Sequence, residues 1–116
     1  MTINWSIQQT DQVEVDLISI YLWTADKFGS HQADEYIDTV SSAIEALVIG
    51  PDLLGSKARD DIGPGIRLLH VQRKGKKGRH FVMFKAMDDR TILVIRLLHD
   101  STNLTKDSLE SSEDSK

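Results

Sequence analysis

Cysteine is absent from this chain of 116 residues, which excludes disulfide bonds and thiolate chemistry. Proline occurs only twice, aromatic residues make up 6%, and no apolar run approaches the roughly eighteen residues that a membrane span needs. Met1–Trp5 lacks the basic and then apolar stretch of a signal peptide, so none is expected. These absences predict a cytoplasmic protein without a membrane partner, and the length predicts one globular domain.

Charge is distributed unevenly along the chain. Residues 1–56 contain nine acidic side chains and a single basic one, Lys27, which gives a net charge of -8. Residues 57–100 contain eleven basic and five acidic side chains, for +6, and the last sixteen residues return to -2. The total of -4 therefore hides a basic segment joined to an acidic one. Such asymmetry favours a macromolecular partner, although a solvated surface without function would give the same counts.

The N-terminal third predicts a strand followed by a helix. Ile3 to Ile7 alternates apolar and polar residues, which is typical of a half-buried strand. Asp11 is a candidate N-cap, with Glu14 three residues later, and Gly29 is placed to end the helix. The expected apolar face of this helix consists of Val13, Leu17, Ile20, Tyr21 and Phe28.

A second helix is expected from Ser30 to Gly50-Pro51, with Val40 and Ile44 in its apolar stripe. The two helices are separated by one or two residues and should form an antiparallel hairpin. Three strands follow at 66–71, 79–87 and 91–99, with a flexible basic loop at 72–78 and a tight turn at 87–90. The order β-α-α-β-β-β predicts an α+β fold in which the helical hairpin packs on a small antiparallel sheet.

Four segments stand in a characteristic order and spacing. They are the helix–glycine–helix corner at residues 23–36, the stretch from Gly50-Pro51 to Pro64-Gly65-Ile66-Arg67, the strand Gly78-Arg79-His80-Phe81-Val82-Met83-Phe84, and the strand Val94-Ile95-Arg96-Leu97-Leu98-His99. Together they resemble the ParE/RelE toxin superfamily of type II toxin–antitoxin systems over roughly residues 3–103. The resemblance implies a toxin domain at 1–103 and a polar tail at 104–116, where a short helix and then disorder are expected.

Within the superfamily the chain resembles the ParE branch more closely. That resemblance implies a plasmid-stabilisation toxin that binds and inhibits DNA gyrase, without being an enzyme, and forms a hetero-oligomer with a cognate antitoxin. Two alternatives remain: a RelE-like endoribonuclease that cuts messenger RNA on the ribosome, and a degenerate toxin that keeps only antitoxin binding. No tyrosine follows Tyr36, whereas RelE-like toxins often supply a late one, so the sequence favours the ParE branch.

A metal-independent ribonuclease needs groups that move protons and stabilise phosphate. If this chain were one, Arg67, Arg79, Arg96 and His99 would be its catalytic candidates. The other interpretation is that these residues support the sheet or bind carboxylates of a partner. No phosphate loop, dinucleotide fingerprint or nucleophile elbow is present, so no cofactor is expected.

The partner-binding candidates combine those residues with the basic loop: Arg67, Arg73, Lys74, Lys76, Lys77, Arg79, Arg96 and His99. An acidic antitoxin segment or the surface of gyrase would match this charge. Direct nucleic-acid binding is less favoured because no aromatic residue interrupts the cluster. His70, His80 and His99 lie on three predicted strands, but their spacing indicates no metal site.

Overall fold

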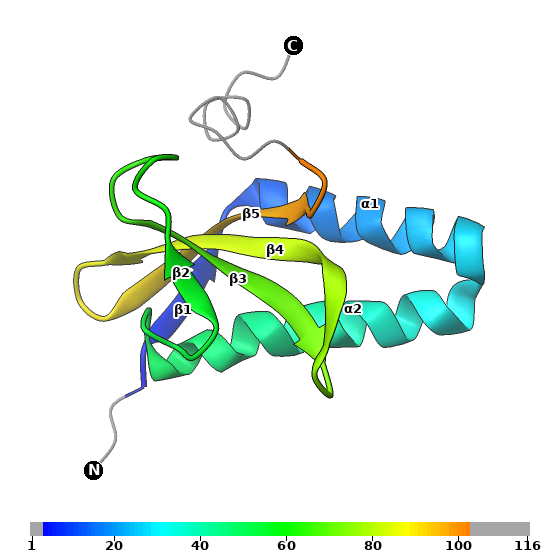
Figure 1. Cartoon of the computed structure of the whole chain (residues 1–116), viewed down its shortest axis with the longest axis horizontal. Coiled ribbons are helices and arrows are strands. Elements are labelled where there is room, and N and C mark those ends of the chain that lie inside the picture. Colours follow the sequence, from blue (N-terminus) through cyan, green and yellow to red (C-terminus); the bar gives the residue numbers. More distant parts are fainter. Residues whose placement is uncertain (1–3, 103–116) are drawn as a thin grey trace.

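A computed structural model describes residues 4–102 of the chain. A five-stranded sheet forms its centre, with the strands in the order β1-β5-β4-β3-β2. Two helices form a hairpin that covers one face of this sheet (Figure 1). The strands are β1 (Ser6–Gln9), β2 (Ser56–Ala58), β3 (Ile66–Arg73), β4 (Lys76–Met87) and β5 (Thr91–His99). The α+β class and the helical hairpin are confirmed, whereas the tail predicted at 104–116 lies outside the described residues.

The sheet is mixed. The three C-terminal strands pair antiparallel, as their short connections predict, and β2 adds an antiparallel edge of three residues that the sequence did not indicate. β1, however, lies parallel to β5, with Ser6 opposite Thr91 and Gln9 opposite Val94. The first strand therefore depends on the last one for its backbone hydrogen bonds.

The helices α1 (Asp11–Phe28) and α2 (Ser30–Glu45) meet at Gly29, whose φ of +95° suits a residue without a Cβ atom. Thr10, and not Asp11, is the N-cap of α1, and Gly29 occupies that position in α2. A 3₁₀ turn, η1 (Ala46–Ile49), carries the chain on to Gly50. Phe28 was wrongly assigned to the apolar stripe, because 65% of its surface is exposed.

Two apolar clusters lie on opposite faces of the sheet. The larger one joins Val13 and Ile20 of α1 and Val40 and Ile44 of α2 to the sheet, around the fully buried Phe84. The smaller one is covered by Ile62 from the loop before β3 and includes Ile66, Leu68, Met83, Ile95 and Leu98. β5 contributes to both clusters, which accounts for its nearly continuous apolar run. No helix among residues 4–102 is long and apolar enough to cross a membrane.

The basic segment at 72–78 is not a loop, which corrects the prediction. Gln72 and Arg73 end β3, Lys76 and Lys77 begin β4, and these residues pair across the hairpin. Only Lys74 and Gly75 form the turn, with φ of +52° and +80°. Positive φ at both positions is the geometry whose twist matches a two-residue β-hairpin. The hairpin backbone therefore fixes the spacing of the basic side chains.

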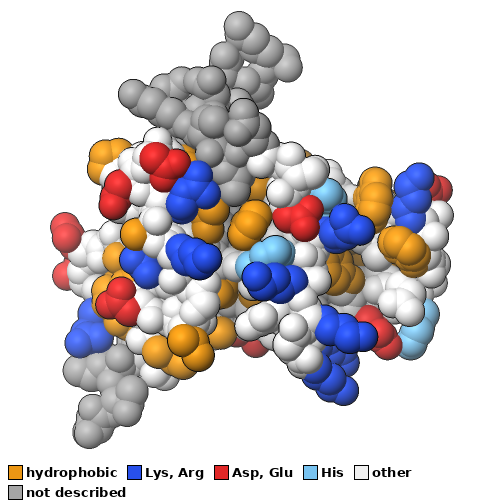
Figure 2. Space-filling model, in the orientation of Figure 1, with side chains coloured by type: hydrophobic (Ala, Val, Ile, Leu, Met, Phe, Trp, Pro, Cys, Tyr) orange, Lys and Arg blue, Asp and Glu red, His pale blue; other side chains and the backbone are white. Residues whose placement is uncertain are grey.

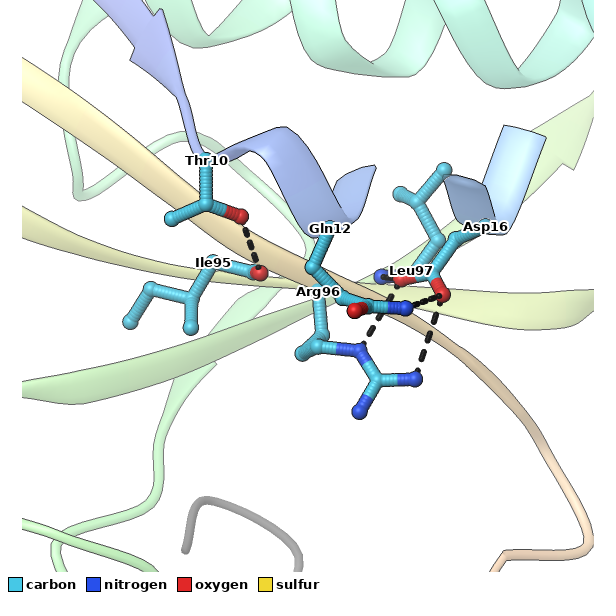
Figure 3. Close-up of polar contacts among 6 residues, drawn as sticks. All are labelled: Thr10, Gln12, Asp16, Ile95, Arg96 and Leu97. Atoms are coloured by element: carbon cyan, nitrogen blue, oxygen red, sulfur yellow. Dashed lines mark hydrogen bonds and ion pairs between the residues drawn. The ribbon is translucent and has the colours of Figure 1, made fainter. Parts of the chain in front are cut away.

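Asp16 of α1 completes the exposed edge of β5 beyond the end of β1 (Figure 3). Its carboxylate accepts the Leu97 N–H at 2.9 Å and a two-point contact from the Arg96 guanidinium, with Nε–Oδ2 at 3.0 Å and Nη2–Oδ1 at 3.1 Å. Gln12 donates to the same carboxylate at 3.1 Å. One turn earlier, the Thr10 hydroxyl donates to the Ile95 carbonyl at 2.8 Å. The start of α1 thus covers the part of the β5 edge that lies beyond the end of β1.

Replacing Asp16 with Asn should destabilise the protein by about 3 kcal/mol, because the Arg96 charge then loses its partner in a largely buried position. Urea unfolding measures this loss. Asp26→Asn, on an exposed turn of the same helix, is the matched control and should stay within about 0.5 kcal/mol of wild type. Combining Asp16→Asn with Arg96→Met should recover part of the loss. An unchanged urea midpoint for Asp16→Asn would contradict the structural role of the pair.

Candidate partner-binding surfaces and the histidine pocket

Two of the predicted site residues, Arg96 and Arg67, form hydrogen bonds within the chain. Arg96 is held by Asp16, so its guanidinium is directed at α1. Arg67 donates to the Ser56 hydroxyl at 3.0 Å and lies 3.8 Å from the Asp52 carboxylate. Its Nε is the one side-chain nitrogen within residues 4–102 that is buried without a hydrogen-bond partner. Both arginines thus contribute to interactions within the chain.

The other basic candidates lie at one end of the molecule. Arg73, Lys74, Lys76 and Lys77 are exposed on the β3–β4 hairpin, and Arg79 is exposed on β4 just beyond them. Figure 2 shows Lys and Arg side chains gathered at the hairpin tip and across the face of the sheet in view. A groove of about 580 Å³ separates this hairpin from α2. Arg73 approaches Glu35 of α2 to 4.0 Å across it.

His99, the last predicted candidate, lines a pocket of about 420 Å³ between α1 and the ends of β4 and β5. Its walls are formed by Asp16, Ser19, Ile20, Trp23, His80, Leu97, His99 and Ser101. His80 stands opposite His99 in the β4–β5 register, with ring centroids 5.2 Å apart and the rings nearly perpendicular. The Trp23 indole meets the His99 ring edge-on at 6.5 Å. The structure thus pairs two histidines with one aromatic wall.

Tyr36 of α2 holds His80 from the side away from this pocket. The Arg79 backbone N–H donates to the Tyr36 hydroxyl at 2.9 Å, and that hydroxyl lies 2.8 Å from His80 Nδ1. Gly78 allows this approach, because a Cβ atom there would stand 2.7 Å from the Tyr36 oxygen. Burial raises the pKa of the Tyr36 phenol, so the hydroxyl keeps its proton.

Burial lowers the pKa of His80 from 6.5 to about 4. His99 and His70 add to this effect by repulsion, whereas Asp100 and Asp16 oppose it. His80 is therefore neutral at neutral pH. His70 lies apart from the pair, with its Nε2 at 2.7 Å from the Gly78 carbonyl and its ring against Phe81. Among residues 4–102, no three groups of the kinds that ligate metals converge.

The structure adds Ser19, Trp23 and Tyr36 to the predicted site residues. Helical spacing was a usable signal for part of this set, since Asp16, Ser19, Ile20 and Trp23 recur at three- and four-residue intervals on α1. Tyr36 had no such signal, because its partner His80 lies 44 positions away. The pocket is formed only when α1 is brought against β4 and β5, and Tyr36 of α2 then contacts His80 from outside the pocket lining.

Comparison with known proteins identifies the family. The family model of the ParE toxin of the type II toxin–antitoxin system parDE matches residues 7–104. The chain therefore belongs to the ParE toxin family. It is also 28% identical over 93 residues to Toxin ParE1 from two strains of Mycobacterium tuberculosis, CDC 1551 / Oshkosh and H37Rv, covering 80% of this chain and 87% of each relative.

Solved structures share the fold. A chain of the chromosomal ParDE TA system from P. aeruginosa superposes with a TM-score of 0.68 at 18% identity, covering 84% of this chain and 98% of that one. A chain of the toxin–antitoxin complex RelBE2 from Mycobacterium tuberculosis gives a TM-score of 0.58 at 15% identity, covering 84% and 99%. At these identities the likeness establishes the fold alone.

Stability should fall by about 1–2 kcal/mol between pH 7 and pH 5 because of His80. Between 6.5 and about 4 the unfolded chain binds a proton at this ring and the folded chain does not, so acid favours unfolding. Urea unfolding at both pH values measures the effect. His80→Gln should show a smaller loss than wild type, and His31→Gln, at an exposed position, should show the wild-type loss. Equal pH dependence in His80→Gln and wild type would contradict the buried neutral ring.

Proposed function

We propose that this chain is a ParE-like toxin that binds DNA gyrase, inhibits it, and is neutralised by a cognate antitoxin. Membership of the ParE toxin family supports the general role. The observation that carries the distinction from a ribonuclease is the Asp16–Arg96 pair. An arginine whose donors are directed at an internal carboxylate is not free to stabilise a reacting phosphate.

The remaining ribonuclease candidates do not converge as a set, because Arg67 lies apart from Arg79 and His99, which are near each other on β4 and β5. Arg67 is held beside Ser56, near β2 at one edge of the sheet. His99 lies in the pocket beside α1, with its Nδ1 engaged by Ser101 at 2.7 Å. Arg79 is exposed, and its backbone, not its side chain, contacts Tyr36. Phosphoryl chemistry needs such groups aimed at one reacting centre, so this arrangement favours a protein that acts by binding.

An apolar row on α1 provides a surface for the antitoxin. Val15, Ile18 and Leu22 follow one another at helical spacing, and they are 53%, 57% and 62% exposed. Contiguous apolar exposure of this kind marks a protein-binding face, and an amphipathic helix would cover it. The similar solved chains come from the ParDE system and the RelBE2 complex, which supports an antitoxin as partner here.

The purified toxin should inhibit supercoiling by DNA gyrase and leave ribosome-bound messenger RNA intact. Parallel gyrase and ribosome assays check both outcomes. Arg79→Gln is the informative variant, since this exposed side chain can change without loss of stability, whereas an Arg96 variant would leave the Asp16 carboxylate without its partner and destabilise the protein. Messenger-RNA cleavage that Arg79→Gln abolishes would establish the RelE-like activity instead. No effect on either target would identify a degenerate toxin.

The basic hairpin should accelerate binding to the antitoxin. Changing Lys74, Lys76 and Lys77 to Ser should slow association with a cognate antitoxin about tenfold at low salt. The difference should narrow as ionic strength rises, because salt screens exposed charges. Surface plasmon resonance measures both rates.

The matched control removes the same charge at separated places, as Lys27, Lys57 and Lys85 to Ser, and should slow association much less. Neither triple variant should change stability by more than about 1 kcal/mol per lysine. Equal association rates in the two variants would show that position in the hairpin is irrelevant, and failure of wild type to bind would contradict this antitoxin pairing.

A further inference from the structure

The pocket beside α1 contains two histidine rings, His80 and His99, to which the proposed function gives no role. It opens next to the apolar row of α1, since Ser19 stands four positions after Val15 and three before Leu22 and so borders both on the helix surface. Trp23 is 48% exposed and Ile20 and Leu97 add apolar wall. A segment lying on the apolar row can therefore extend a group into this pocket.

Tyr36 favours one tautomer of His80. The Tyr36 oxygen already accepts the Arg79 N–H, which leaves its own proton available for His80 Nδ1, and that arrangement makes Nδ1 the acceptor. A neutral imidazole whose Nδ1 accepts must carry its proton on Nε2. Burial keeps the ring neutral, as its low pKa indicates. His80 therefore presents a fixed Nε2–H donor on the side away from Tyr36.

His99 is fixed in the same way by a different donor. The Ser101 backbone N–H lies 3.1 Å from His99 Nδ1 and can only donate, so Nδ1 accepts and Nε2 carries the proton. The Ser101 hydroxyl, at 2.7 Å, supports the same arrangement. Within residues 4–102, neither Nε2 has a hydrogen-bond partner. Neither is fully buried, because Arg67 Nε is the one buried side-chain nitrogen there without a partner. Two neutral N–H donors are thus available at one pocket.

We propose that this pocket binds an uncharged peptide segment, placing a carbonyl oxygen against the Nε2–H donors of His80 and His99 and an apolar side chain against Trp23. A carbonyl oxygen has two lone pairs and accepts from two donors at once. The apolar side chain would bury surface on Trp23, Ile20 and Leu97. Identification of the segment as part of the antitoxin rests on the proposed function.

Charge decides against an anionic ligand. The donors are neutral, Asp16 of the pocket wall is already paired with Arg96, and the Asp100 carboxylate stands 3.4 Å from His99 Nδ1. An anionic ligand would therefore meet the negative charge of Asp100 beside His99. A peptide carbonyl offers the same acceptor geometry without that repulsion, which favours peptide over nucleic acid.

Nuclear magnetic resonance on the intact toxin tests the proposal without an antitoxin. The probe is N-acetyl-leucinamide, compared with the anion N-acetyl-leucinate and with uridine. Resonances of the Trp23 indole and of the His80 and His99 rings report the pocket, and Trp5, the only other tryptophan, reports non-specific binding. Ring nitrogen shifts of the free protein give the two tautomers directly. We expect the amide to bind in the millimolar range, as suits so small a ligand, and more tightly than the anion or uridine.

Two variants distinguish the contribution of the histidine N–H donors to affinity from the contribution of the pocket's shape. His99→Phe keeps a ring beside Trp23 and removes one donor, so affinity for the amide should fall roughly two- to tenfold. Tyr36→Phe removes the hydroxyl that favours one tautomer of His80. A smaller fraction of molecules then carries the proton on Nε2, so affinity for the amide should fall roughly twofold. Tyr21→Phe is the control, because the Tyr21 hydroxyl makes no hydrogen bond within the described residues and its loss should change nothing.

The proposal is overturned if the amide leaves Trp23 unshifted, if Trp5 shifts as much as Trp23, or if uridine or the anion binds more tightly. Nε2 acceptors in the nitrogen spectrum would overturn it as well, whatever the affinities. Failure of the antitoxin or gyrase experiments would leave these spectra unchanged, so the two proposals fail separately.

Discussion

The carboxylate of Asp16 joins the first helix, α1, to the last strand, β5. β5 is flanked by β1 for only four residues, and beyond them its edge would expose unpaired backbone groups. Asp16 satisfies one of these groups and neutralises Arg96 in the same place. Removing it leaves both a backbone group and a charge without a partner, so this contact helps to hold α1, together with Val13 and Ile20 of the larger apolar cluster.

The same contact changes the interpretation of a sequence motif. Arg96 and His99, both in the β5 motif, were predicted as candidates for the same catalytic or partner-binding site. In the structure they have different roles: Arg96 forms an ion pair with Asp16 of α1, and His99 lines the pocket with His80. A basic residue in a strand motif is therefore weak evidence for phosphate chemistry until its acidic partner is located, and here that partner lies 80 positions away.

Elements with local signals were predictable, and those specified by distant contacts were not. The Gly29 corner, the two apolar helical stripes and the three antiparallel strands follow from periodicity and short connections. The partner of β1 and the three-residue β2 have no local signal. Lysine and glycine at 72–78 have low strand propensity, yet the Lys74–Gly75 turn and the cross-strand pairing keep the hairpin in register. The histidine pair shows a further limit: counting straight from Met87 opposite Thr91 places His99 against Arg79, and the irregularity between Met83 and Phe84 shifts it to His80.

Parallel pairing of the first and last strands also has a consequence for synthesis. Thr10 and Ile95, joined by a hydrogen bond, are separated by 85 positions, so α1 can reach its final place only after nearly all of the domain has been made. Contacts of such long range form late because the loop between them must first be closed. A copy whose translation stops before Thr91 contains the residues of the helical hairpin but lacks the strand that pairs with β1 and contacts Asp16. Prematurely terminated copies are therefore structurally incomplete.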